Sequence, residues 1–255
     1  EGVLEPFQGT LVLNANDPNV MRLADKAPQA SVVTFGVARN QESTRVTGEA
    51  AEGKFCPRCS RPLVYDWYQY SHIGRFRCEA CGFGTPDTID VNLEDIDLSA
   101  GTFAWNGSTF HNPYEGLYSM YNAAAVLALG KLLGIPAPKA EAVFRHAPQP
   151  AGRNETFEAD GRRIVLNLVK NPTGANEVMK VIERDPALKQ IVIVLNDREQ
   201  DGRDVSWIYD THFEKFMNPA TQAIWCTGTR SGDMGLRMQY GGWTGPLHMV
   251  SDLKK

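Results

Sequence analysis

The 255-residue sequence lacks any apolar run long enough to span a membrane, and its first residues do not resemble a signal peptide. It has no internal repeat and no low-complexity tract. It also lacks an excess of positive charge, because 26 basic residues face 30 acidic ones and the formal net charge is −4. Proteins that coat nucleic acid need such an excess, so we exclude a broad nucleic-acid surface. These absences predict a globular protein without a transmembrane segment.

Cysteine is scarce, with only five residues in the chain. Cys226 lies in an apolar stretch, Ala223-Ile-Trp-Cys-Thr-Gly228, that is typical of a buried strand, so we expect it to be part of a core. No Ser-His-Asp or Cys-His arrangement suggests a nucleophile. An unpaired buried thiol in a chain that also has a thiolate metal site indicates a reducing, cytoplasmic setting.

The other four cysteines form two Cys-x-x-Cys pairs separated by eighteen residues, namely Cys56 with Cys59 and Cys78 with Cys81. This spacing predicts a zinc ribbon over residues 54–84, in which a hairpin brings both pairs around one tetrahedral ion. Four thiolates leave no position for water, so the site is structural. Gly82 provides a turn under the second pair. His72 lies within the hairpin and could compete as a ligand; two disulfides or a redox Cys-x-x-Cys are the other interpretations.

The rest of the chain alternates short apolar strands with amphipathic segments. Before and after the ribbon we expect a β-α-β unit over 9–37, with Asp17 as N-cap, a sheet segment with an Asn-Gly turn over 101–110, and helices over 114–134 and 138–146. After a linker at 147–152 we expect strands at 155–159, 163–169, 191–195 and 223–227, and helices at 173–185 and 231–240. This pattern predicts an α/β protein with domains at 1–146 and 147–255, the second one Rossmann-like.

Four short motifs occur in the order found in Mur ligases: Leu13-Asn-Ala-Asn-Asp-Pro18, Tyr121-Asn-Ala-Ala-Ala125, Gly152-Arg-Asn-Glu155 and Lys170-Asn-Pro-Thr-Gly174. Together with the inserted four-cysteine ribbon and Asp204-Val-Ser-Trp-Ile-Tyr-Asp210, they resemble the MurT branch of that family. The resemblance implies the C-terminal part of a Mur ligase central ATPase domain, carrying the ribbon, followed by a Mur ligase C-terminal domain.

The resemblance also implies a reaction. MurT-like subunits use ATP and Mg²⁺ to activate the α-carboxylate of D-glutamate in lipid II as an acyl phosphate. Ammonia from a GatD-like glutaminase partner then gives D-isoglutamine at the inner face of the cell membrane. A non-catalytic module, in which the ribbon and the Rossmann-like domain bind a partner protein, is the alternative function.

The chain departs from the family most clearly in its phosphate-binding loop, because it contains no G-x-x-x-x-G-K-[ST] motif. Its Gly-Lys pairs, at Gly53-Lys54 and Gly130-Lys131, lack both the spacing and the following hydroxyl residue. We therefore expect a fragment of a MurT-like protein that cannot amidate alone.

Candidate catalytic residues follow from the resemblance. Asp204 and Asp210 come after the strand 191–195, where an open α/β sheet presents residues to a ligand crevice, and could orient or deprotonate ammonia. A helix cap for Asp204 and a surface position for Asp210 are the alternatives. Asn196 and Asp197 share the same strand end.

Candidate nucleotide-binding residues are Asn122 beside the adenine, Arg153 at the phosphates, and Lys170 with Asn171 at the start of a helix whose amides favour an anion. For Arg153 the alternative is a hinge salt bridge, and for Lys170 and Asn171 it is an ordinary helix start. Asn14, Asn16 and Asp17 could line the same pocket. Ser119 and Asn167 stand where related ligases have an asparagine and an aspartate.

Overall fold

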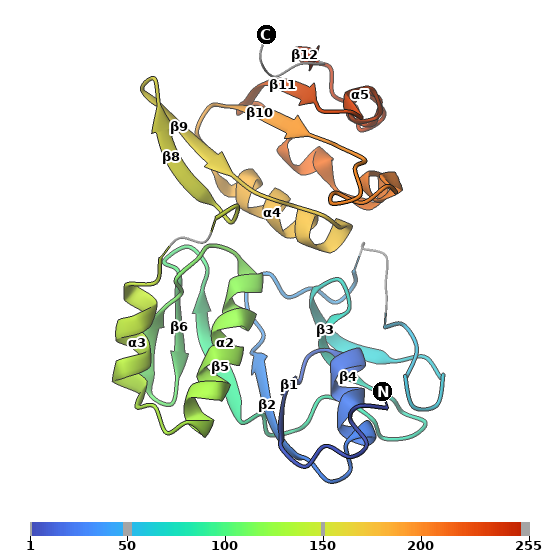
Figure 1. Ribbon diagram of the computed structural model, residues 1–255, viewed down its shortest axis with the longest axis vertical. Coiled ribbons are helices and arrows are strands. Elements are labelled where there is room, and N and C mark those ends of the chain that lie inside the picture. Colours follow the sequence, from blue (N-terminus) through green and yellow to red (C-terminus); the bar gives the residue numbers. More distant parts are fainter. Residues whose placement is uncertain (1, 48–52, 149–150, 251–255) are drawn as a thin grey trace. The chain divides into compact units, whose positions relative to one another are not determined.

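The computed structural model describes residues 2–47, 53–148 and 151–250, and the chain divides into two compact units, Glu1–Asn154 and Glu155–Lys255 (Figure 1). Part of the expected linker (149–150), the last five residues of the expected second domain and part of the segment before the cysteines (48–52) lie outside the described residues. Among the described residues, no helix combines the length and apolar character needed to cross a bilayer.

Unit 1 is built on a five-stranded sheet with the order β1-β2-β5-β6-β7. The strands are β1 (Thr10–Asn14), β2 (Ser31–Val37), β5 (Val91–Asp97), β6 (Thr102–Trp105) and β7 (Ser108–His111). The pairs β1–β2 and β2–β5 are parallel, and the pairs β5–β6 and β6–β7 are antiparallel. Asn106 and Gly107 connect β6 to β7 with φ of 50° and 73°, so the predicted Asn-Gly turn is confirmed.

The connection from β1 to β2 begins as predicted but is tighter than a regular helix. Asp17 caps α1 (Pro18–Met21) by accepting hydrogen bonds from the N–H groups of Asn19 and Val20. The chain then continues as a 3₁₀ helix, η1 (Arg22–Lys26). Only four residues of this connection are therefore α-helical, and the predicted helix continues through Leu23 and Ala24 in the 3₁₀ form.

One face of this sheet is covered by α2 (Leu117–Leu132), which packs on β1, β2 and β5 (Figure 1). Its helical spacing of Leu117, Met120, Ala124 and Leu127 places these side chains in a buried core. Gly134, with φ of 68°, ends the helix as expected. The shorter α3 (Ala137–Arg145) packs on β7 and adds Phe144 to the same core.

The hairpin of β3 (Val64–Tyr70) and β4 (Ile73–Arg77) is inserted between β2 and β5, and residues 54–84 around it are called the cysteine hairpin below. It has its own core, in which Phe76 and Phe83 pack with Leu13 and Met21 from β1 and α1. The cysteine hairpin is therefore attached to the sheet by apolar contacts as well as by the chain.

Unit 2 contains a parallel three-stranded sheet, a separate hairpin and two α-helices. The sheet has the order β10-β11-β12 and consists of β10 (Lys189–Val194), β11 (Thr221–Thr227) and β12 (Leu247–Val250). The hairpin is formed by β8 (Glu155–Ala159) and β9 (Arg162–Leu166). The helices are α4 (Pro172–Arg184), α5 (Ser231–Tyr240) and the 3₁₀ helices η2 (Ser206–Asp210) and η3 (Phe213–Phe216). Side chains from α4, η2, η3 and α5 form one core with Ile224 and Cys226 of β11, so the buried position predicted for Cys226 is confirmed.

Candidate functional site

The four Cys-x-x-Cys cysteines converge on one point. The Sγ atoms of Cys56 and Cys81 are 3.6 Å apart, those of Cys59 and Cys78 are 3.5 Å apart, and all four lie within 4.8 Å of one another. A tetrahedral ion with Zn–S bonds of about 2.3 Å requires sulfurs about 3.8 Å apart. The donor set and its spacing therefore fit a zinc ion. All four cysteines are free, so the disulfide interpretation finds no support here.

Both pairs are held by the same backbone pattern. The N–H of Cys56 donates to the carbonyl of Arg61 and the N–H of Ser60 to that of Cys56, at 2.7 and 2.8 Å. The N–H of Cys78 donates to the carbonyl of Phe83 and that of Gly82 to Cys78, at 2.6 and 2.9 Å. Gly82 adopts the left-handed conformation predicted for it, with φ of 73°.

The backbone N–H groups around the cysteines also affect the ionisation of the thiols. Burial opposes ionisation of the Cys78 thiol, but the N–H groups of Cys81 and Ala80 and the neighbouring thiols outweigh it and lower its pKa to about 7. Backbone N–H groups favour ionisation at Cys59 and Cys81 as well, but burial and the neighbouring thiols outweigh them and raise the pKa of both. The thiolate, the form in which cysteine binds a metal, is therefore favoured at Cys78.

The cysteine hairpin also contacts the loops that follow β1 and β2. The Gly74 N–H donates to the Asn16 carbonyl at 2.9 Å, and Gln69 Nε2 donates to the Ala38 carbonyl at 2.9 Å. His72 does not join the cysteine cluster; its Nε2 atom lies 3.4 Å from Asp17 Oδ1. The hairpin therefore supports the carboxyl-end edge of the parallel strands, where α/β sheets bind ligands.

Asn16 is the centre of this edge. It is 1% exposed, and its Oδ1 atom accepts hydrogen bonds at 3.0 Å from the Val37 N–H and the Tyr121 hydroxyl. Asn14 Oδ1 accepts from the Asn16 N–H. The side chains of Asn14, Asn16 and Asp17 thus all make hydrogen bonds within the unit. For Asn14 and Asn16, these bonds explain the presence of the side chain without a bound nucleotide.

We expect Asn16→Ala to lower the free energy of unfolding by about 2–4 kcal/mol, because it removes the acceptor of two buried hydrogen bonds. Chemical denaturation measures this difference. Asn19→Ala, an exposed position on α1, is the matched control and should change stability by under about 0.5 kcal/mol. Equal effects of the two substitutions would show that Asn16 is not the link between these elements.

Asn122 lies beside Tyr121 on α2, and its side chain is exposed. It is therefore accessible to a ligand. Ser119, one turn earlier, is buried; its Oγ donates to the Tyr114 carbonyl and accepts from Asn112 Nδ2, both at 2.5 Å. Asn112 was not predicted from the sequence. It lies in the loop before α2, and only the folded chain brings its amide to Ser119.

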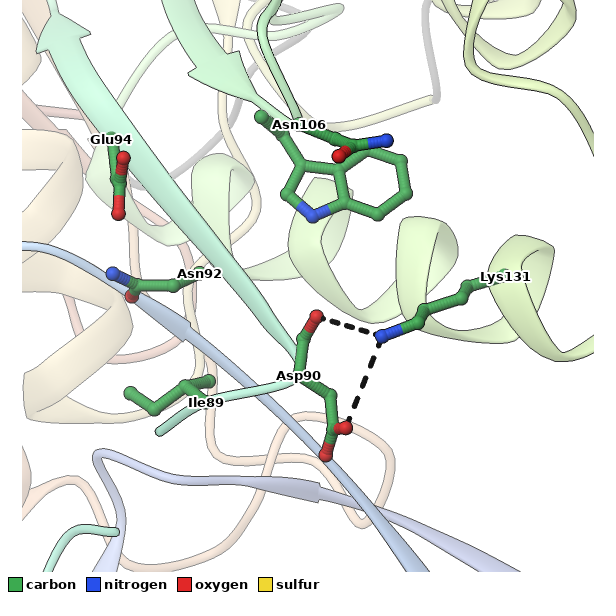
Figure 2. Close-up of a pocket in the computed structure, with 7 residues that line it drawn as sticks. Ile89, Asp90, Asn92, Glu94, Asn106 and Lys131 are labelled. Carbon is green, nitrogen blue, oxygen red and sulfur yellow. Dashed lines mark hydrogen bonds and ion pairs between the residues drawn. The ribbon is translucent and has the colours of Figure 1, made fainter. Parts of the chain in front are cut away.

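A shallow hollow of about 340 Å³ lies elsewhere on unit 1 (Figure 2). Its lining comes from β5 and the residues before it, from the β6–β7 turn and from α2: Ile89, Asp90, Asn92, Glu94, Trp105, Asn106 and Lys131. Lys131 Nζ donates to the Asp90 carbonyl at 3.1 Å, and the Thr34 N–H and hydroxyl hold the pKa of Asp90 below its usual range. None of the predicted site residues lines this hollow.

In unit 2, residues that follow β10 and β11 meet at one strand edge. Asp197 accepts from the Thr229 hydroxyl at 2.8 Å and from Arg230 at 3.3 Å, and Arg230 Nε donates to Asp233 at 2.7 Å. The Thr229 hydroxyl, then Arg230, hold the pKa of Asp197 below its usual range. Gly228 allows this approach: a Cβ there would lie 2.3 Å from the Leu195 carbonyl oxygen.

Sequence reasoning identified Asn196 and Asp197 but missed Thr229, Arg230 and Asp233. The available signal was Gly228-Thr-Arg-Ser-Gly-Asp233, a polar turn between an apolar strand and an amphipathic helix. In parallel strands such a turn lies at the same edge as the residues after the neighbouring strand.

Asp204 and Asp210 lie at the two ends of the η2 segment, and both are exposed. Asp204 Oδ1 accepts from the Ser206 N–H at 2.8 Å, but the residue that caps η2 is Val205, so Asp204 is not its N-cap. Hydrogen bonds from the Ser206 side chain and N–H hold the pKa of Asp204 below its usual range. Exposure leaves both carboxylates accessible to a substrate. Their catalytic role stays a prediction.

Lys170 and Asn171 begin α4. Asn171 Oδ1 caps the helix by accepting from the Gly174 N–H at 2.8 Å, as expected for an ordinary helix start. Lys170 Nζ donates to the Gln200 carbonyl at 3.3 Å and so connects the start of α4 to the loop after β10. Arg153 is exposed near the boundary between the two units.

Comparison with known proteins identifies the family. A model described as MurT ligase C-terminal matches residues 168–254. The MurT subunit of lipid II isoglutaminyl synthase from Staphylococcus aureus strain COL is 33% identical over 247 residues, which are 96% of this chain and 55% of that protein. The chain belongs to the MurT family. The Streptococcus pneumoniae MurT subunit is 28% identical over 92% of this chain and 52% of its own length. The chain thus spans about half the length of these relatives.

Solved structures show the same fold. A pseudomurein peptide ligase type C from Methanothermus fervidus aligns with a TM-score of 0.67 at 19% identity, covering 96% of this chain and 46% of that one. MurF from Acinetobacter baumannii aligns with a TM-score of 0.58 at 13% identity, covering 96% and 43%. The MurT-family chain therefore has a Mur ligase-like α/β fold, as the sequence predicted.

Proposed function

We propose that this chain is part of an ATP-dependent carbon–nitrogen ligase that amidates the α-carboxylate of D-glutamate in lipid II. The γ-phosphate of ATP is transferred to the carboxylate, giving an acyl phosphate and ADP. Ammonia then attacks the acyl carbon and phosphate leaves, which yields D-isoglutamine. The observation that carries the proposal is the similarity to MurT subunits of lipid II isoglutaminyl synthases over 96% of the chain.

The exposed polar residues of the described units are consistent with this chemistry. Asn122 is accessible on α2 for a nucleotide base, and Lys170, Asn171 and Arg153 provide polar groups for phosphate oxygens. Asp204 and Asp210 offer carboxylates that can orient ammonia or accept its proton. The chain has no phosphate-binding Gly-x-x-x-x-Gly-Lys loop, so these residues would not hold ATP by themselves. ATP with Mg²⁺ would bind to the complete protein.

The cysteine hairpin would be a structural zinc ribbon. Its four sulfurs fit a tetrahedral site without an open position, so the metal would hold the hairpin rather than take part in amidation. The three-stranded parallel sheet with α4 and α5 would form the Rossmann-like domain of the ligase. A GatD-like glutaminase would supply ammonia, and the complex would act at the cytoplasmic face of the membrane that carries lipid II.

Formation of ADP tests this proposal. The full-length natural protein that contains these residues should form ADP only when ATP, Mg²⁺ and lipid II are present, and should form it continuously only when ammonium is added. The present chain alone should release none. ADP formation that ignores lipid II would contradict the proposal. If no ADP forms while the protein still binds a glutaminase, the non-catalytic binding module is the better description.

A further inference from the structure

The segment from Asp204 to Phe216 contains both predicted catalytic aspartates but little regular structure. Two short 3₁₀ helices, η2 and η3, are its only helices, and no strand crosses it. Within an isolated 3₁₀ turn, few backbone N–H and C=O groups are hydrogen-bonded to one another. The position of the aspartates therefore depends on what the rest of unit 2 bonds to this backbone.

Arg237 of α5 provides part of that support. Its side chain is 7% exposed, and its Nε and Nη2 atoms donate to the carbonyls of Ile208 and Thr211 at 3.0 and 2.8 Å. Nη2 also lies 2.8 Å from Glu214 Oε1, and the guanidinium lies over the Phe213 ring at 5.5 Å. One buried cation thus spans η2 and η3.

Asn176 of α4 provides a second support. It is 1% exposed, its Nδ2 atom donates to the Asp210 carbonyl at 3.4 Å, and its Oδ1 atom accepts from the His212 N–H at 2.7 Å. Together the two side chains bond consecutive residues from both sides of the turn: Asp210 and His212 through Asn176, Thr211 through Arg237. The backbone that carries Asp210 is therefore held at three successive residues.

We propose that Arg237 and Asn176 are positioning residues that fix the Asp210 carboxylate, and through η2 the Asp204 carboxylate, for the amidation step. The inference rests on the proposed function. A buried guanidinium is costly to desolvate, and well-packed apolar residues often give equal or greater stability, so a role in geometry accounts for these side chains better than stability does. Misplacement of a reacting group by about 1 Å can cost about 100-fold in rate.

The test compares Arg237→Lys, Asn176→Asp and Asn176→Leu in the full-length protein. Lysine keeps the charge but cannot reach two carbonyls as a fork, and aspartate keeps an acceptor for the His212 N–H while losing the donor to Asp210. Cys226→Ala is the control, because it weakens the same core from β11 and leaves Arg237 and Asn176 in place. The measurements are kcat, the KM values for ATP and lipid II, and hydrogen exchange at residues 208–212.

We expect kcat to fall about 10- to 100-fold in the Arg237 and Asn176 variants, with both KM values within about twofold. Exchange at His212 should rise in Asn176→Leu and stay slow in Asn176→Asp. The control should lose stability but keep kcat. Faster exchange with unchanged kcat would overturn the inference, as would a loss of kcat matched by the control. If the wild-type protein itself does not amidate, the proposed function fails, and the positioning role fails with it even where the exchange data show that the segment is held.

Discussion

Replacing Cys78 by serine is expected to abolish zinc binding and unfold the cysteine hairpin. The remaining three thiols cannot complete a tetrahedral thiolate site, and structural zinc contributes about 10–16 kcal/mol of binding free energy in small zinc domains. Cys56 and Cys78 also belong to the core that packs Phe76 and Phe83 against Leu13. The loss of packing should therefore extend from the cysteine hairpin to β1.

Metal analysis and thermal unfolding measure this effect. Wild-type protein should contain one zinc per chain, and Cys78→Ser none. The melting temperature should fall by more than about 10 °C, since each kcal/mol corresponds to roughly 2–4 °C in a chain of this size. Cys226→Ser is the matched control: it changes a buried thiol outside the cluster and should retain zinc. A Cys78→Ser protein with full zinc content would show that the four cysteines do not form the site.

Removing the charge of Asp204 or Asp210 should have the largest effect on catalysis. We expect Asp204→Asn and Asp210→Asn each to lower kcat by about 10²- to 10⁴-fold, the usual contribution of a positioned acid or base. Asparagine can still accept the hydrogen bond from the Ser206 N–H, so Asp204→Asn keeps the turn and removes only the charge. The Asp210 substitution leaves its carbonyl bond to Asn176 in place.

Steady-state amidation with ammonium as the nitrogen donor measures these variants without relying on a glutaminase. Asp201→Asn is the control, because Asp201 is an exposed carboxylate of the same loop, and it should retain kcat within about twofold. If both aspartate variants match this control, the catalytic carboxylate lies elsewhere. Asp197 would then be the first residue to test, since the Thr229 hydroxyl and Arg230 hold its pKa below the usual range.

The features that sequence reasoning found are those specified by neighbouring residues. The Cys-x-x-Cys pairs, the Asp17 cap and the Asn106-Gly107 turn each depend on a few consecutive positions, and all three are seen. The helix over 231–240 was predicted with the bounds that the structure has, and its buried Met234 and Met238 lie one turn apart.

The missed features depend on positions that are distant in sequence. β5 was not predicted because Glu94, Asp95 and Asp97 make it look like a loop, yet it pairs with β2 and β6 within the sheet. The bond between Asn16 and Tyr121 joins residues 105 positions apart. The contacts of Arg237 with Ile208 and of Arg230 with Asp197 likewise require the folded unit, and no local pattern specifies them.

We propose above that this MurT-family chain is part of a ligase that amidates lipid II. The most direct measurement is tandem mass spectrometry of lipid II incubated with the full-length protein, ATP, Mg²⁺ and ¹⁵N-labelled ammonium. We expect one ¹⁵N atom in the amide at the α-carboxylate of D-glutamate, formed only with ATP. Label on another carboxylate, or unmodified lipid II from a protein that is folded and contains zinc, would contradict it.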